Sequence, residues 1–334
     1  MRDGRIEVVR GDIVESVHRV SVAVVDAAGR LRASAGSPEQ VTFARSAVKP
    51  IQALPLVTDG ILDSFGFGDR ELALCCASHS GEPWHVDTVL GMLKRIGVGE
   101  AALACGAHPP FHEASAQALR ESGIEPGRVH NNCSGKHAGM LALASGHGWP
   151  VAGYEQAGHP VQRRMLAEMS AWSGVPSDAI AIAVDGCGVS TFAMSVEAMA
   201  RAFGALAGAA RRGEAGPERV LRAMGRYPEY VAGTGRLCTE LSRAVHGRIL
   251  AKVGAEGVYC AAVPGAELGI ALKVEDGAWR AAEPALLAVL RSLALITDDE
   301  MAELAGFAEP GILNTRGERV GGLRAAIRLQ PGRD

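Results

Sequence analysis

Ser46 and Lys49 are the first residues along the chain whose types and spacing suggest chemistry. A serine hydroxyl is too weak an acid to attack a carbonyl at neutral pH unless an adjacent base removes its proton. Residues three apart lie on the same face of a helix, so a helix beginning here would bring the Lys49 amine to the Ser46 hydroxyl. Burial or a second cation would lower the pKa of the lysine enough to make it a base. The pair therefore predicts a serine nucleophile with its own base.

Two later stretches extend this pattern. Lys252-Val253-Gly254 ends an expected strand, and Ser78-His79-Ser80 forms a hydroxyl-rich turn after an expected helix. Together with Ser-x-x-Lys they follow the order of the serine β-lactamase and penicillin-binding signature, which ends in Lys-Thr-Gly. Each stretch also has an ordinary interpretation, because Lys252 can be a solvated strand-end lysine and the Ser78 turn a simple helix terminus. No Gly-x-Ser-x-Gly elbow surrounds any serine, which disfavours a Ser-His-acid triad.

Two cysteines lie in glycine-bearing turns: Cys133 within Asn131–His137, and Cys187 within Asp185–Thr191. Both turns are expected to lead into a helix, where backbone amides converge and thiols become acidic. Two such thiols can bind zinc, with a nitrogen ligand and water completing a tetrahedron. The alternative is that both are buried structural thiols, the commonest environment of a free cysteine. Spacing does not choose among the further candidate ligands, which are three histidines: His79, His85 and His137.

Composition and charge restrict the class of partner. The 334 residues are 48% hydrophobic, which is enough for a large core. The net charge of −3 and the lack of a block of like charges disfavour a nucleic-acid partner and a polybasic membrane patch. No apolar run approaches the length of a membrane span, and no secretory signal is recognised. Seven cysteines, an odd number, indicate reduced thiols rather than a disulfide framework. These features favour a cytoplasmic protein that acts on a small neutral or zwitterionic molecule.

Strands are expected at both ends of the chain and helices between them. The strands are expected at 6–9, 20–25, 31–34, 179–184, 249–253, 258–263, 270–274 and about 318–328. The helices are expected at about 69–77, 86–97, 113–122, from the Asn131–His137 turn to 145, 160–172, 217–225, 236–246 and 286–296, with one more capped by Ser190 or Thr191. A Gly/Ala-rich loop is expected at 204–216, and Pro50 and Pro55 interrupt the helix after Ser46.

This order predicts an α+β architecture, with a sheet formed from both chain ends and an inserted helical block. One domain spanning 1–334 is expected, with a sheet subregion at about 1–45 and 248–334 and a helical subregion at about 46–247.

The chain resembles the L-asparaginase II family, the rhizobial-type, zinc-binding asparaginases, over almost its whole length. The resemblance rests on five ordered motifs: Arg45–Gln52, Cys76–Glu82, Asn131–Met140, Asp185–Ser190 and Lys252–Val258. It implies a fold related to serine β-lactamases and glutaminases, a homodimer, and hydrolysis of L-asparagine to L-aspartate and ammonia. Val253 replaces the threonine of the β-lactamase signature and lacks its hydroxyl, which weakens the interpretation as an antibiotic hydrolase.

The resemblance also implies residue roles. It gives two Ser-Lys pairs, Ser46 with Lys49 and Ser78 with Lys252. It places zinc ligands on Cys133, Lys136 and Cys187, although a lysine ligand is chemically unusual because it must be neutral.

Substrate contacts are expected from three further residues. Arg45, or a backbone nest, is expected to bind the substrate carboxylate. Asp185 is expected to bind the substrate ammonium or a metal-bound water, and His79 to contribute to substrate binding. Two alternatives stay open: a serine acyl-hydrolase acting on glutamine or a β-lactam, and a catalytically silent, zinc-stabilised binding protein.

Overall fold

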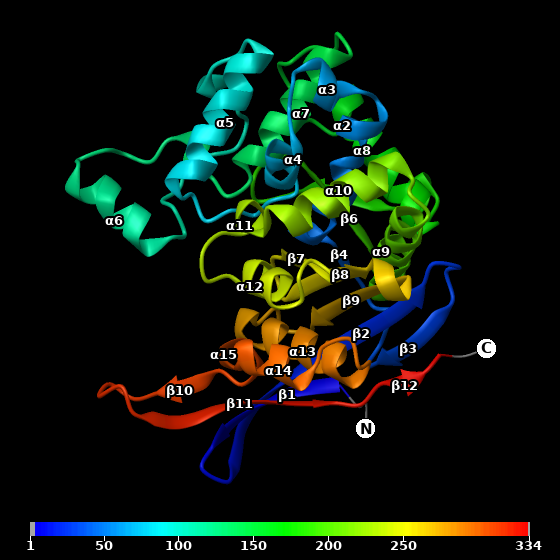
Figure 1. Cartoon of the computed structure of the whole chain (residues 1–334), viewed down its shortest axis with the longest axis vertical. Helices are drawn as coiled ribbons and strands as arrows, with labels where there is room; N and C mark the ends of the chain where they lie inside the picture. The colour runs from blue at the N-terminus through cyan, green and yellow to red at the C-terminus, as the bar shows by residue number, and fades with distance from the viewer. Residues whose placement is uncertain (1–3, 333–334) are drawn as a thin grey trace. The chain divides into compact units, whose positions relative to one another are not determined.

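The computed structural model describes residues 4–332, which form a mixed α and β structure (Figure 1). Its internal contacts divide the chain into two compact units. Unit 1 comprises Met1–Ala47, Met194–Gly208 and Glu240–Asp334, and unit 2 comprises Val48–Ala193 and Ala209–Thr239. Within residues 4–332, no helix has both the length and the apolar character needed to cross a membrane.

Unit 1 contains an antiparallel sheet of nine strands within the described residues. The strands are β1 (Gly4–Arg10), β2 (Ile13–Asp26), β3 (Leu31–Ala35), β7 (Leu250–Gly254), β8 (Val258–Val263), β9 (Leu268–Val274), β10 (Gly311–Leu313), β11 (Arg319–Ile327) and β12 (Gln330–Pro331). The main order is β10-β11-β1-β2-β9-β8-β7, and β3 pairs with both β2 and β12. The sheet therefore joins strands from both ends of the chain, as expected. A further short strand, β4 (Val41–Phe43), precedes the Ser46 turn.

Helices α9 (Val196–Arg211) and α13 (Trp279–Ser292) pack against this sheet. Figure 1 shows α13, in orange, lying along the strands of unit 1. Helix α9 approaches the sheet closely at Gly204, where an added Cβ would lie 2.7 Å from the Val25 carbonyl oxygen. A Cβ on Gly269 of β9 would lie 2.0 Å from the Gly204 nitrogen. Two short helices, α14 (Asp298–Glu303) and α15 (Ala305–Ala308), follow α13.

Unit 2 is mainly helical. Its helices are α1 (Lys49–Gln52), α2 (Leu54–Thr58), α3 (Ile61–Ser64), α4 (Asp69–Cys75), α5 (Pro83–Ile96), α6 (Glu113–Glu121), α7 (Ser134–Gly146), α8 (Pro160–Ser173), α10 (Ala215–Arg226) and α11 (Pro228–Val231), and α12 (Leu237–Ala244) begins in it. Helix α7 is buried from Ser134 to Ala144. It packs tightly on α4, because a Cβ on Gly135 would lie 2.4 Å from the Leu74 carbonyl oxygen. This close packing brings the residues after α4 to the start of α7.

Two sequence-based expectations are wrong. The helix expected to begin at Ser190 or Thr191 is instead strand β6 (Ser190–Ser195), which pairs with β5 (Ala181–Val184) in a hairpin. The turn that joins them is closed by a bond from Asp185 N to Val189 O. The loop expected at 204–216 is instead the continuation of α9 to Arg211, since its glycines and alanines permit close packing on the sheet. Helix α13 also begins earlier than expected, at Trp279.

Candidate active site

Lys49 is the centre of a buried polar cluster in unit 2. It is the first residue of α1, with Pro50 next to it, and its side chain is 1% exposed. The amine donates to the Ala77 carbonyl at 2.5 Å and to Ser78 Oγ at 3.1 Å. It also donates to Cys133 Sγ at 3.1 Å. The cluster therefore places a lysine amine within hydrogen-bond distance of a serine hydroxyl, the arrangement that serine activation requires.

Ser46 and Lys252 lie in unit 1. Ser46 is in a 3₁₀ turn at Arg45–Val48, where Arg45 has an unusual φ of +51°. This turn packs against the end of β7, since a Cβ on Gly254 would lie 3.1 Å from the Ala44 carbonyl oxygen. Lys252, two residues earlier in β7, is fully buried, and its amine donates to the Val253 carbonyl at 2.7 Å.

The Ser-Lys contact found in unit 2 is not one of the two pairs expected from the sequence. Ser46 with Lys49, and Ser78 with Lys252, stay predictions. The contact described within unit 2 joins Lys49 to Ser78. Lys49 is consequently a candidate base for Ser78 as well as for Ser46.

The two thiols form a second polar group in unit 2. Lys136 Nζ donates to Cys187 Sγ at 3.0 Å, and Cys187 Sγ lies 3.7 Å from Asp185 Oδ2. A hydrogen bond from Cys133, helped by the charges of Lys136 and Lys49, lowers the pKa of Cys187 to about 5 despite its burial. That hydrogen bond and burial raise the pKa of Cys133 to about 12. Burial lowers the pKa of Lys136, but the nearby sulfurs outweigh it and raise that pKa above its usual range.

These side chains form a suitable donor set for a soft divalent metal. Cys133 and Cys187 are in hydrogen-bond contact, and the Lys136 amine touches the second sulfur. Within residues 4–332, no group of three or more His, Cys, Asp or Glu side chains is arranged to hold a metal ion. A metal bound by both thiols would have the Lys136 amine, once deprotonated, as an available nitrogen ligand. One expectation is corrected: Cys187 lies in the β5–β6 hairpin turn and not at a helix start.

The three histidines considered as additional ligands have other partners. His79 Nδ1 accepts from Gly81 N at 3.2 Å, and its Nε2 donates to Ser134 Oγ at 2.9 Å. His85 is likewise bonded through both ring nitrogens. His137 Nδ1 bonds to the Tyr154 hydroxyl at 2.6 Å, whereas its buried Nε2 has no described partner. His79 and His85 thus serve as internal hydrogen-bonding groups.

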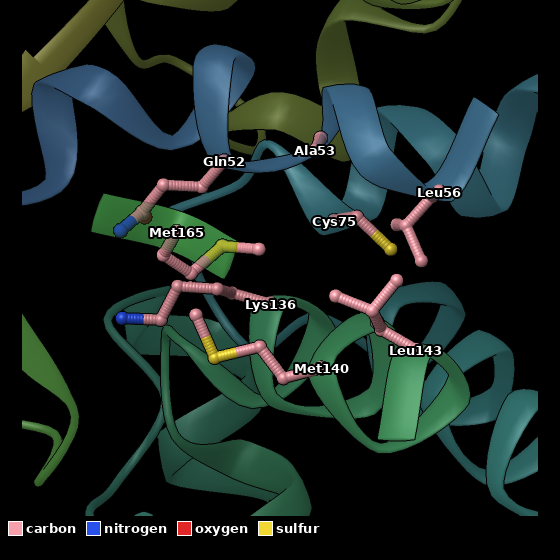
Figure 2. A pocket seen from close by; sticks show the side chains of 9 residues that line it. Gln52, Ala53, Leu56, Cys75, Lys136, Met140, Leu143 and Met165 are labelled. Atoms are coloured by element: carbon pink, nitrogen blue, oxygen red, sulfur yellow. The ribbon is translucent and has the colours of Figure 1, made fainter. Parts of the chain in front are cut away.

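A small cavity lies beside the stem of Lys136. Its lining residues are Gln52, Ala53, Leu56, Cys75, Lys136, Gly139, Met140, Leu143 and Met165. Figure 2 shows the nitrogen atoms of Gln52 and Lys136 on the same side of it. The cavity measures about 10 Å³, room for about one water molecule. It is too small for an amino acid, so it is not a substrate site.

Sequence reasoning did not find the segment that packs against the Ser78 loop. Ala232-Gly233-Thr234-Gly235-Arg236 follows α11, and Ser78 N donates to the Val231 carbonyl just before it at 3.0 Å. The available signal was the Gly-Thr-Gly pattern, because Gly233 and Gly235 have positive φ angles of 119° and 68°. Glu82, which contacts this segment, belonged to a recognised motif but had no assigned role.

Comparison with known proteins gives one informative match. A search of curated proteins finds no significant similarity. A family model described as L-asparaginase II matches residues 6–325, nearly the whole chain. The chain therefore belongs to the L-asparaginase II family, a family of asparaginase-type amidohydrolases that act on small molecules.

Proposed function

We propose that the protein is an L-asparagine amidohydrolase that releases L-aspartate and ammonia through a serine nucleophile activated by lysine. The observation that carries this proposal is the buried Lys49 amine 3.1 Å from Ser78 Oγ. Family membership supports the amide class of substrate. We also propose that the fold is related to serine β-lactamases and glutaminases, and that the protein acts as a homodimer in the cytoplasm.

The reaction proceeds through an ester on serine. The serine oxygen attacks the side-chain amide carbon while its proton passes to a neutral lysine amine. The carbon–nitrogen bond then breaks, and the lysine returns the proton to the departing nitrogen, which leaves as ammonia. Water next attacks the ester, gives one proton back to the serine oxygen and releases L-aspartate.

The protonation of Lys49 sets a condition on this step. Its amine donates to three acceptors, Ala77 O, Ser78 Oγ and Cys133 Sγ, which uses all three protons of an ammonium group. To accept the proton of Ser78, the amine must first release one of these protons.

Backbone donors are proposed to stabilise the oxyanion, each contributing about 3 kcal/mol. The amide of Ser78 is already bonded to the Val231 carbonyl, so the oxyanion donors are other groups. Arg45 is proposed to bind the substrate carboxylate, with His79 as a further binding residue, and Asp185 to bind the substrate ammonium. Two Ser-Lys pairs complete the proposed set, Ser46 with Lys49 and Ser78 with Lys252.

We further propose that Cys133, Lys136 and Cys187 hold a zinc ion. A bound zinc ion would supply positive charge that orients the polar groups of the substrate. Elemental analysis of the purified protein is expected to give about one zinc per chain, and Cys187→Ser to reduce that content strongly. Cys238→Ser, which changes another buried cysteine, is the matched control and is expected to retain the metal.

Separate Ser46→Ala and Ser78→Ala variants test the covalent mechanism. Ammonia release from L-asparagine is expected to fall by at least about 10³-fold in the variant that loses the nucleophile, and a covalent adduct is expected in the other. Full activity in both variants would contradict a serine mechanism. Faster turnover of glutamine or a β-lactam would indicate a different acyl-hydrolase. Zinc-dependent melting without turnover of any amide would indicate a binding protein.

A further inference from the structure

Ser80 and Glu82 are two buried polar residues that the proposed reaction does not use. They follow Ser78 in the loop between α4 and α5 and are 2% and 0% exposed. A buried carboxylate costs folding free energy unless hydrogen bonds compensate for its lost hydration. Its position here therefore requires an explanation from the groups that surround it.

Both side chains bond to the segment Val231–Arg236, which we name the anchor segment. Glu82 Oε1 accepts from the Thr234 backbone N at 2.8 Å, and Oε2 accepts from Thr234 Oγ1 at 2.8 Å. Ser80 Oγ donates to the Ala232 carbonyl at 2.9 Å and accepts from Arg236 Nη1 at 3.3 Å. The anchor segment also accepts from Ser78 N, as described above. Every second residue from Ser78 to Glu82 thus bonds to the anchor segment: Ser78, Ser80 and Glu82.

His85 links the backbone of Glu82 to the backbone of Glu229. Its Nδ1 accepts from Glu82 N at 3.1 Å, and its Nε2 donates to the Glu229 carbonyl at 2.8 Å, close to the anchor segment. An Nδ1 acceptor requires a neutral ring. Burial lowers the pKa of His85 to about 4, so the ring is neutral at pH 7.

The anchor segment fits Glu82 with no spare space. A Cβ on Gly233 would lie 2.6 Å from Glu82 Oε1 and 2.7 Å from Ser80 Oγ. Its φ of +119° is also one that side-chain-bearing residues rarely adopt. Thr239 also bonds to the segment, because its Oγ1 donates to the Gly233 carbonyl at 2.7 Å. The Glu82 carboxylate is therefore in close contact with the segment and is one of the groups that fix its position.

We propose that Glu82 is a positioning residue that fixes the anchor segment and, through it, the backbone of Ser78. The inference rests on the proposed function, since it takes Ser78 as part of the reacting group. A displacement of about 1 Å at a reacting group lowers the rate by about 10²-fold, so loss of the Glu82 bonds is expected to reduce turnover without removing any group that touches substrate.

Glu82→Ala tests the proposal, with Glu82→Gln as the conservative variant. Glu82→Ala is expected to lower kcat by about 10²-fold, with KM changed by less than about threefold. Glu82→Gln is expected to recover most of the activity, because its amide oxygen accepts from Thr234 N and its NH₂ donates to Thr234 Oγ1. Glu168→Ala is the matched control: that carboxylate also accepts two side-chain hydrogen bonds, from Arg164 and Trp172. It is expected to lower the melting temperature while leaving kcat per folded molecule unchanged.

Hydrogen exchange supplies a readout that does not depend on activity. Peptides covering 231–236 are expected to exchange faster in Glu82→Ala, and to exchange at the wild-type rate in Glu168→Ala. If Glu82→Ala does not fold, Gly233→Ala displaces the same segment and is expected to give the same two changes.

The outcomes separate this proposal from the proposed function. A wild-type protein that releases no ammonia would overturn the proposed function, whereas exchange at 231–236 would still test the anchor. In an active wild type, a Glu82→Ala kcat within about twofold of the wild-type value would overturn the positioning role. Unchanged exchange at 231–236 would overturn it as well.

Discussion

Acid is expected to destabilise the protein through His85. The folded protein holds this ring neutral with a pKa of about 4, whereas an unfolded histidine titrates near 6.5. As the pH falls below about 6.5, the unfolded chain therefore binds a proton that the folded protein excludes. The stabilisation from neutral His85 is complete above the unfolded pKa and is lost progressively as the pH falls towards the folded pKa.

The size of this effect follows from the two pKa values. At about pH 4.5 nearly every unfolded chain is protonated at this position, but only a minority of folded chains is. Between pH 7 and about pH 4.5, this difference lowers the free energy of unfolding by about 2 kcal/mol. That is a large fraction of the roughly 5–15 kcal/mol that stabilises a typical protein.

Urea unfolding of the wild type and of His85→Asn at several pH values measures the effect. The side-chain oxygen of the introduced asparagine would still accept from Glu82 N, but it does not titrate. The variant is expected to be less stable at pH 7 by about 1 kcal/mol, because the bond to the Glu229 carbonyl is lost. Its further loss of stability between pH 7 and about pH 4.5 should be about 2 kcal/mol smaller than that of the wild type. Carboxyls with lowered pKa values, such as Asp59, are common to both proteins and cancel. An equal loss in both proteins would refute the reasoning.

Two further predictions concern the lysine and the glycines. Lys49→Met is expected to lower kcat for ammonia release by about 10²-fold or more, because the proposed base is lost. Lys94→Met, on the exposed face of α5, is the control and should leave kcat unchanged. A Lys49→Met kcat within about threefold of the wild-type value would contradict a role of Lys49 as base. Gly204→Ala is expected to lower the free energy of unfolding by about 1–3 kcal/mol, because the added methyl meets the Val25 carbonyl. Gly91→Ala, where no atom lies near the added methyl on α5, should instead raise the free energy of unfolding by about 0.5–1 kcal/mol. Urea unfolding measures both variants. Changes of the same sign in the two variants would contradict the packing argument.

Much of the fold follows from local sequence patterns. Alternating and continuous apolar runs predicted β8 at Val258–Val263 within the observed bounds, and α8 was predicted to within a residue. The errors arose where tertiary packing decides. Ser190 and Thr191 are good helix caps, but they lie in a strand because the Asp185–Val189 turn pairs β6 with β5. The glycines of α9 resemble a loop in sequence, and only the sheet beside them explains why they are helical.

The candidate site was predictable in its residue types and less so in its contacts. Motif spacing identified Ser78, Lys49 and Cys133 separately, but it did not show that the Lys49 amine contacts both of the others. That contact depends on the close packing of α7 on α4, which a single sequence does not reveal. The role of Glu82 was also hidden, because its partner Thr234 is far along the chain and in an irregular segment.

The pairing of β1 with β11 affects how the chain can be synthesised and folded. Gly4 faces Ile327 across this pair, while β2, on the other side of β1, also pairs with β9. A ribosome therefore releases the hairpin of β1 and β2 long before β9 or β11 exists. During that interval both edges of the hairpin are open, and the exposed Ile13, Val14 and Val17 lie close to its turn. Open strand edges with apolar side chains promote association between nascent chains. Slow expression at low temperature is therefore expected to increase the yield of folded protein.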